Sequence, residues 1–109
     1  MAITYKVLAQ SAPSATTNTD VYTVGAGKSA VISTVSICNR STTAGAFRIA
    51  VRPVGATLAN QHYIAYDVSV SGSDTTNLTL GITLAATDVV TVYASTANLS
   101  VSLFGSEIS

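Results

Sequence analysis

The chain alternates apolar and polar residues over short stretches, and turn-forming residues separate one stretch from the next. Within residues 46–52, Phe47 and Ile49 alternate with Arg48 and Arg52. Successive side chains of a β-strand point to opposite faces, so this period of two predicts a strand with one buried face and one outward face. No stretch keeps the apolar spacing of an amphipathic helix for two turns. Strands are predicted over residues 3–8, 20–24, 30–38, 46–52, 62–70, 77–82, 89–95 and 99–104.

The spacing of these stretches predicts the fold class. They recur at intervals of roughly 8–12 residues, which is typical of β-sandwiches and small β-barrels. A length of 109 residues is usual for a single domain and allows one hydrophobic core. We therefore predict an all-β fold for residues 1–109, a single-domain antiparallel β-sandwich or jelly-roll-like barrel of about eight strands.

Residues 10–19 break the alternation. Ser, Ala, Thr and Asn dominate this segment, and Pro13 interrupts it. Its composition predicts a long loop, or an arm that lets the first strand lie apart from the rest and reach a neighbouring subunit. Pro13, Thr16 and Thr17 are therefore candidate contacts with a partner.

Charge is scarce on this largely apolar chain. Asp, Glu, Lys and Arg make up 9% of the residues, against about 25% in an ordinary soluble domain, and the net charge is zero. Little electrostatic repulsion keeps copies of such a protein apart, so the composition indicates a subunit of an assembly more than a freely diffusing catalyst. The five cations are scattered along the sequence, which argues against a nucleic-acid partner.

The sequence also bears on location. Its first residues lack a basic segment followed by an apolar one, and no apolar run approaches the ~20 residues of a membrane-spanning helix. We expect synthesis in the cytoplasm and no membrane partner.

Three features invite a chemical interpretation, and each is weak. Residues 25–29 resemble part of a phosphate-binding P-loop, but Tyr22 stands where that motif needs glycine, and residues 30–35 have a strand pattern in place of a helix. A lone His62 and a lone Cys38 cannot form an ordinary zinc site, and Cys38 is predicted to be a small buried hydrophobic residue. We expect no cofactor, no metal and no enzymatic activity.

Arginines form the remaining candidate site. Arg40, Arg48 and Arg52 are three of the five cations and fall within one predicted hairpin. Arginine suits planar hydrogen bonding and interface ion pairs, so these residues are candidates for a partner interface. A plain solvated face is the alternative, and the sequence leaves both open.

Several segments together resemble a known family. These segments are residues 21–34, 38–40, 47–53, 62–67, 80–84, 88–95 and 104–107. The chain resembles the small virion structural proteins of tailed bacteriophages, of the cyanobacterial and marine phage type. The resemblance implies an accessory β-domain attached to a shell or a tail, often as an oligomer, and brings no catalytic residues with it.

Two functions follow from this resemblance as expectations. The first is a capsid decoration (cement) protein that binds the major capsid protein on the outer head surface, with a homotrimer favoured, and stabilises the head. The alternative is a tail-fibre or baseplate domain that contacts other tail or baseplate proteins and binds a host-surface glycan. In that case exposed Tyr63, Tyr66 or Tyr93 would stack on the sugar rings.

Overall fold

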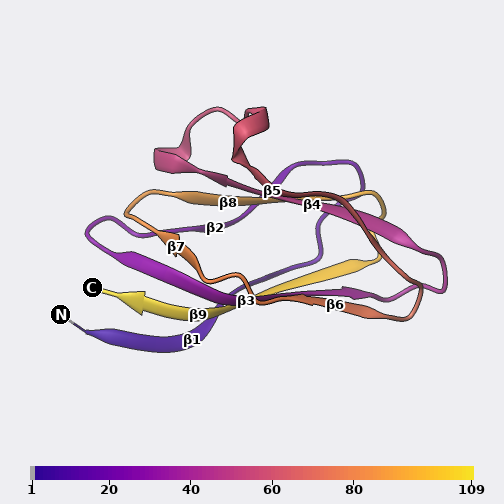
Figure 1. Ribbon diagram of the computed structural model, residues 1–109, viewed down its shortest axis with the longest axis horizontal. Helices are drawn as coiled ribbons and strands as arrows, with labels where there is room; N and C mark the ends of the chain where they lie inside the picture. Colours follow the sequence, from indigo (N-terminus) through magenta and orange to yellow (C-terminus); the bar gives the residue numbers. More distant parts are fainter. Residues whose placement is uncertain (1) are drawn as a thin grey trace.

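The computed structural model describes residues 2–109, which form two antiparallel β-sheets packed face to face (Figure 1). Sheet A has the strand order β1-β9-β3-β6, with β7 also pairing with β3, and sheet B has the order β2-β8-β4-β5. The elements are β1 (Ile3–Ser11), β2 (Thr19–Thr23), β3 (Ser29–Asn39), β4 (Gly45–Arg52), β5 (Tyr63–Val70), β6 (Thr75–Leu78), β7 (Ile82–Leu84), β8 (Val89–Ala94) and β9 (Leu99–Ile108), with single 3-10 turns η1 (Pro53–Gly55) and η2 (Asn60–His62).

The strand order is that of a jelly roll. Strands β6 and β7 pair with successive parts of the same strand, β3, and so occupy one position in sheet A. Counted in this way, each sheet has four positions, and the chain passes between the sheets in the order of a two-sheet jelly roll. The prediction of an all-β antiparallel sandwich is confirmed, with nine strands where about eight were expected.

The core lies between the two sheets and is built by alternation. Phe47 and Ile49 of β4 point inward and are fully buried, as their spacing predicts. They pack in one cluster with Ile32 of β3 and Leu103 of β9, among others. Burying a side chain of this size stabilises the fold by about 1.5–3 kcal/mol, so this inner layer holds the two sheets together.

Three of the predicted strands differ from the observed ones by more than one residue at a boundary. The predicted strand over residues 77–82 is two strands, because Gly81 adopts a φ of 63° between β6 and β7. Strand β1 continues to Ser11, and β9 continues past Phe104 to Ile108. Both extensions add to the same pair of strands, which run antiparallel along the edge of sheet A.

The predicted loop or arm over residues 10–19 is shorter in the structure. Gln10 and Ser11 belong to β1 and pair with β9, so the first strand does not lie apart from the rest. The connection spans residues 12–18 and lies against its own domain, since Ala15 forms a bridge with Ala94 of β8. Within residues 2–109, no helix has the length and apolarity needed to cross a membrane.

Candidate functional site

The outer face of sheet A carries no charged side chain within residues 2–109. Directly paired residues point their side chains to the same side of a sheet, so the register fixes which residues share this face. Phe104, for example, pairs with Val7 and with Thr34, while its neighbour Leu103 points into the core. The outward side chains are Ile3, Tyr5, Val7 and Gln10 of β1; Ser100, Ser102, Phe104, Ser106 and Ile108 of β9; Ser29, Val31, Thr34, Ser36 and Cys38 of β3; Thr75 and Asn77 of β6; and Thr83 of β7.

The ten charged side chains of the chain lie elsewhere. Lys6 and Glu107 are on the inner side of sheet A. Asp20, Arg48, Arg52 and Asp67 are on the outer side of sheet B, and Lys28, Arg40, Asp74 and Asp88 are in connections between strands. A partner can therefore cover the outer face of sheet A without removing any charge from water, whereas covering sheet B would desolvate two ion pairs.

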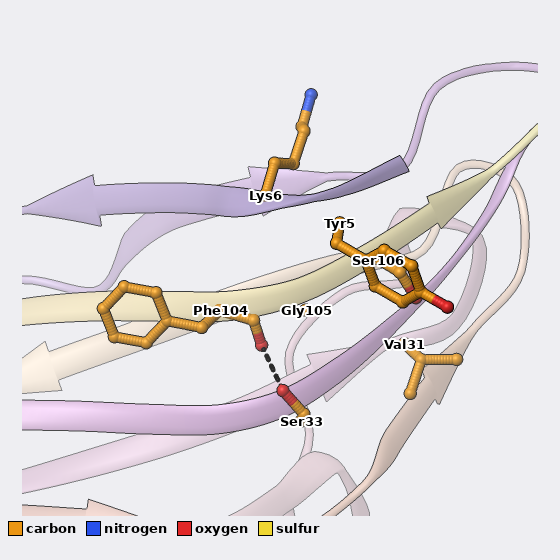
Figure 2. Close-up of a pocket in the computed structure, with 7 residues that line it drawn as sticks. All are labelled: Tyr5, Lys6, Val31, Ser33, Phe104, Gly105 and Ser106. Atoms are coloured by element: carbon orange, nitrogen blue, oxygen red, sulfur yellow. Dashed lines mark hydrogen bonds between the residues drawn. The ribbon is translucent and has the colours of Figure 1, made fainter. Parts of the chain in front are cut away.

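Exposed apolar side chains gather at one end of this uncharged face. Ile3, Tyr5, Val7 and Phe104 are all exposed, and Tyr5 keeps 83% of its surface accessible. Figure 2 shows Tyr5 and Phe104 beside an open hollow of about 490 Å³, which is also lined by Lys6, Val31, Ser33, Gly105 and Ser106. Contiguous apolar surface of this kind marks interaction sites in soluble proteins.

A hydrogen-bonded cluster joins the two sheets beneath this end of the face. Glu107 of β9 accepts a 2.8 Å bond from Lys6 Nζ and a 2.7 Å bond from the hydroxyl of Tyr22, which comes from β2. The bonds from Lys6 and then from Tyr22 hold the pKa of Glu107 below its ordinary value. Burial, reinforced by the bond to Glu107, raises the pKa of Tyr22 above its ordinary value. The cluster fixes β1 to the body of the domain.

Acid should weaken this cluster. Because the pKa of Glu107 is lower in the folded protein than its ordinary 4.5, its contribution to stability is full above that value and is lost as pH falls through the folded pKa. We expect Glu107→Gln to cost about 1 kcal/mol at pH 7. Urea unfolding of both proteins at several pH values measures this difference, which should shrink toward zero as the pH falls below 4.5 and through the lower folded pKa. A constant difference would contradict the assignment.

The outer face of sheet B carries a cluster of arginine and tyrosine. The guanidinium of Arg48 stacks between the rings of Tyr66 and Tyr93, at 4.2 and 4.3 Å from their centroids. Its Nε donates a 2.6 Å bond to Asp67, and Tyr63 packs edge-on against Tyr66. The three tyrosines singled out in the sequence thus lie together. Arg48 already occupies one ring face of two of them.

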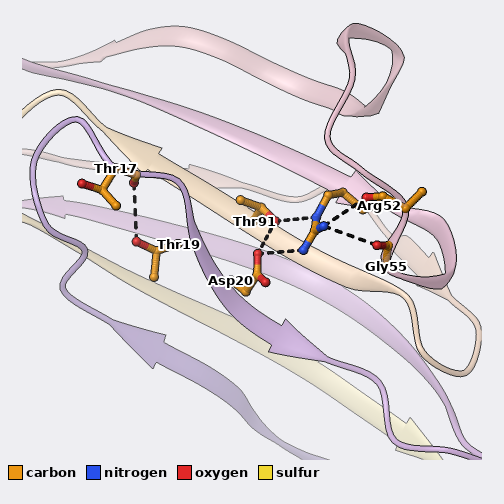
Figure 3. Close-up of polar contacts among 7 residues, drawn as sticks. Thr17, Thr19, Asp20, Arg52, Gly55 and Thr91 are labelled. Atoms are coloured by element: carbon orange, nitrogen blue, oxygen red, sulfur yellow. Dashed lines mark hydrogen bonds and ion pairs between the residues drawn. The ribbon is translucent and has the colours of Figure 1, made fainter.

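Arg52 is the centre of a second network on sheet B (Figure 3). Its guanidinium donates to Asp20 of β2 at 2.9 Å and to the hydroxyl of Thr91 of β8 at 3.1 Å. It also bonds to the carbonyl of Ala56 at 3.0 Å, just after η1. This side chain therefore ties β2, β8 and the η1 turn to β4, which is a structural role within the chain.

The three arginines do not form one patch. Arg48 and Arg52 share the outer side of β4, but Arg40 follows β3 and donates to the carbonyl of Ala97 at 2.7 Å. Each of them has an acceptor within its own chain. Their role in a partner interface stays a prediction, and the uncharged face of sheet A is the stronger candidate.

The three candidate partner contacts in the connection between β1 and β2 differ in their exposure to solvent. Pro13 is buried against the domain, whereas Thr16 and Thr17 are exposed. The backbone N–H of Thr16 donates to the carbonyl of Ala94 at 2.8 Å, and the Thr17 hydroxyl donates to the carbonyl of Ala15 at 3.1 Å. This segment caps the end of β8 and leaves the two threonine side chains at the surface.

The two residues considered for metal or thiol chemistry have other surroundings. His62 is nearly buried, and its Nδ1 accepts a 3.0 Å bond from the backbone N–H of Ala59. Cys38 is half-buried on the outer face of sheet A, so its predicted place in the core is wrong. Within residues 2–109, no three His, Cys, Asp or Glu side chains are grouped to hold a metal ion.

Sequence reasoning missed the most buried polar side chain of the domain, Asn39 at the end of β3. Its amide nitrogen donates to the carbonyls of Thr43 and Val70, and its oxygen accepts from the N–H and hydroxyl of Ser41. Such a residue fixes the turn after β3. A pattern of apolar and polar positions cannot identify it.

Comparisons with protein-family models and with curated proteins gave no match to this chain.

Proposed function

We propose that this chain is a non-enzymatic structural protein of a tailed-phage virion, a decoration protein that binds the outer surface of the head and stabilises it. The observation that carries the proposal is the uncharged outer face of sheet A, opposite a sheet that bears two ion pairs. One side of the domain is suited to lie against other subunits, and the other is suited to face water. Jelly rolls are common among viral capsid domains, which supports the proposal as an analogy of fold.

The proposed mechanism is mechanical. When the uncharged face spans neighbouring copies of the major capsid protein, the apolar side chains lose water and the Ser and Thr hydroxyls exchange water for protein partners. Separating the capsid subunits then requires breaking these contacts as well as their own. Each copy adds a modest free energy, but an icosahedral head binds many copies.

Heating tests this role. Particles assembled without the protein should release their DNA at a temperature several degrees lower than complete particles, and adding back the purified chain should restore the higher temperature. Equal release temperatures with and without the chain would remove the proposed stabilising role.

The tyrosine cluster of sheet B favours a second candidate function. Tyr63, Tyr66 and Tyr93 lie together with Asp67, an arrangement that could stack on and hydrogen-bond a host-surface glycan, as expected of a tail-fibre or baseplate domain. The copy number per particle separates the two candidates. Hundreds of copies indicate a head protein, whereas tens or fewer indicate the tail apparatus.

A further inference from the structure

Residues 3–7 of strand β1 form an unprotected edge of sheet A. Proteins usually prevent such an edge from pairing with another chain by means of short strands, bulges, prolines or outward charges. The opposite edge of sheet A is divided into β6 and β7, which have four and three residues. In sheet B, the edge strand β2 has five residues and carries Asp20, and β5 is bulged where Asp67 adopts a φ of 52°. Strand β1 has nine residues, no proline and a single charge, Lys6, that is bonded inward to Glu107. Its bulge lies between Val7 and Ala9, so residues 3–7 run without a bulge.

The backbone groups that β1 presents to the outside can be identified. Ala2 and Ser109 exchange both N–H···O bonds, at 3.0 and 2.9 Å, so they form a hydrogen-bonded pair of the β1–β9 ladder. Such pairs alternate with non-hydrogen-bonded ones in an antiparallel ladder. Given the register, the N–H and C=O groups of Ile3, Tyr5 and Val7 therefore point away from β9, toward the open edge.

We propose that this edge pairs with β1 of a second copy of the chain, antiparallel and about a two-fold axis at Tyr5. Tyr5 would then lie opposite Tyr5 of the partner subunit, and Ile3 opposite Val7 of the partner subunit. Each of these three positions has free backbone donors and acceptors, so every pair forms two N–H···O bonds. The two sheets become one continuous sheet.

The side chains suit this register. Ile3, Tyr5 and Val7 are all exposed on the outer face, so the pairing covers apolar surface on both copies. On the inner side, Lys6 would lie opposite Thr4 of the partner subunit, and no like charges meet directly. A two-fold axis perpendicular to the sheet also places both uncharged outer faces on the same side. The dimer would thus present twice the uncharged surface of one chain.

Charge substitutions at Tyr5 test the pairing. Tyr5 keeps 83% of its surface exposed, so replacing it should leave the folded monomer intact. We expect the wild-type chain to sediment at twice the mass of one chain, and Tyr5→Lys and Tyr5→Glu each to sediment as monomers, because like charges would face each other across the axis. An equimolar mixture of the two variants should recover the dimer, since opposite charges then meet at the same position.

The control is Ile64→Lys, which changes an exposed apolar residue of β5 in sheet B and should leave the dimer unchanged. A wild-type monomer, a trimer, or a dimer that survives both Tyr5 substitutions would overturn the proposal. So would a mixture that stays monomeric while both variants keep the circular dichroism spectrum of the wild type. The measurement uses the isolated chain without particles, so its outcome is independent of the proposed virion role.

Discussion

Gly105→Ala is expected to lower the free energy of unfolding by about 2–3 kcal/mol, a large part of the stability of a domain of this size. A Cβ at this position would overlap the backbone carbonyl of Val31 and press on the backbone of Ile32. Neither is the end of a flexible side chain that could move aside. Relief requires β3 and β9, which are neighbours within sheet A, to separate locally.

The matched control is Gly25→Ala, because both glycines lack a left-handed φ and both substitutions remove the same backbone freedom of the unfolded chain. The nearest atom to a Cβ at Gly25 is Cδ of Lys28, at 3.4 Å, which belongs to a flexible side chain. This change should stay within about 0.5 kcal/mol. Thermal unfolding should show a melting temperature lower by roughly 10 °C or more for Gly105→Ala alone. Similar curves for the two variants would contradict the close approach of β3 and β9.

The central part of the fold could be predicted from the sequence because its signal is local. In β4, alternation between apolar and charged residues identifies both the strand and its buried face, and Phe47 and Ile49 are in the core as predicted. The same period of two identified the other long strands. A jelly roll could be named only as an alternative, because strand order depends on contacts between distant parts of the chain.

Glycines were the main source of error at strand boundaries. The predicted strand over residues 99–104 stops before Gly105, yet β9 continues through this residue. Glycine is needed there because the neighbouring backbone leaves no room for a side chain. Gly81 lies inside the predicted strand over residues 77–82, yet its positive φ separates β7 from β6. The same residue type has opposite effects at the two positions, and the difference lies in what packs against it.

The segregation of charge between the two outer faces could not be predicted. A shift of one residue moves every later side chain of a strand to the other face. The β1–β9 register shifts between Val7 and Ala9, and the β3–β9 register shifts between Ile32 and Thr34, so a strict alternation through either strand assigns part of it to the wrong side. The low charge of the chain was visible in its composition, but its distribution was not.

The ion pairs of Arg48 and Arg52 could not be predicted either. Arg48 and Arg52 point outward from β4, as predicted, but their partners Asp67 and Asp20 come from other strands. Those partners are distant in sequence, so the residues read as free cations in the sequence alone. The uncharged face of sheet A is therefore a stronger candidate interface than the arginines of sheet B.

The second large effect is expected when a charge is placed on that face. Ser102 lies on the outer face of β9, the strand between β1 and β3, and its side chain is half-buried. Aspartate has a short side chain, so its carboxylate cannot reach the rim of an interface and would be buried without a partner. We expect Ser102→Asp to weaken binding to particles about 100-fold, which corresponds to about 2.8 kcal/mol.

Ser69→Asp is the matched control, because Ser69 is exposed on the outer face of sheet B, where it pairs with Ala46. It adds the same charge to the opposite side of the domain. Both variants should keep the fold of the wild type, which circular dichroism and urea unfolding can verify before binding is measured.

The binding of these two variants to particles that lack the chain tests most directly whether the uncharged face is the one that other subunits cover. The account predicts that Ser69→Asp binds as the wild type does, while Ser102→Asp loses about 100-fold in affinity. Wild-type affinity for Ser102→Asp, or a loss confined to Ser69→Asp, would contradict it.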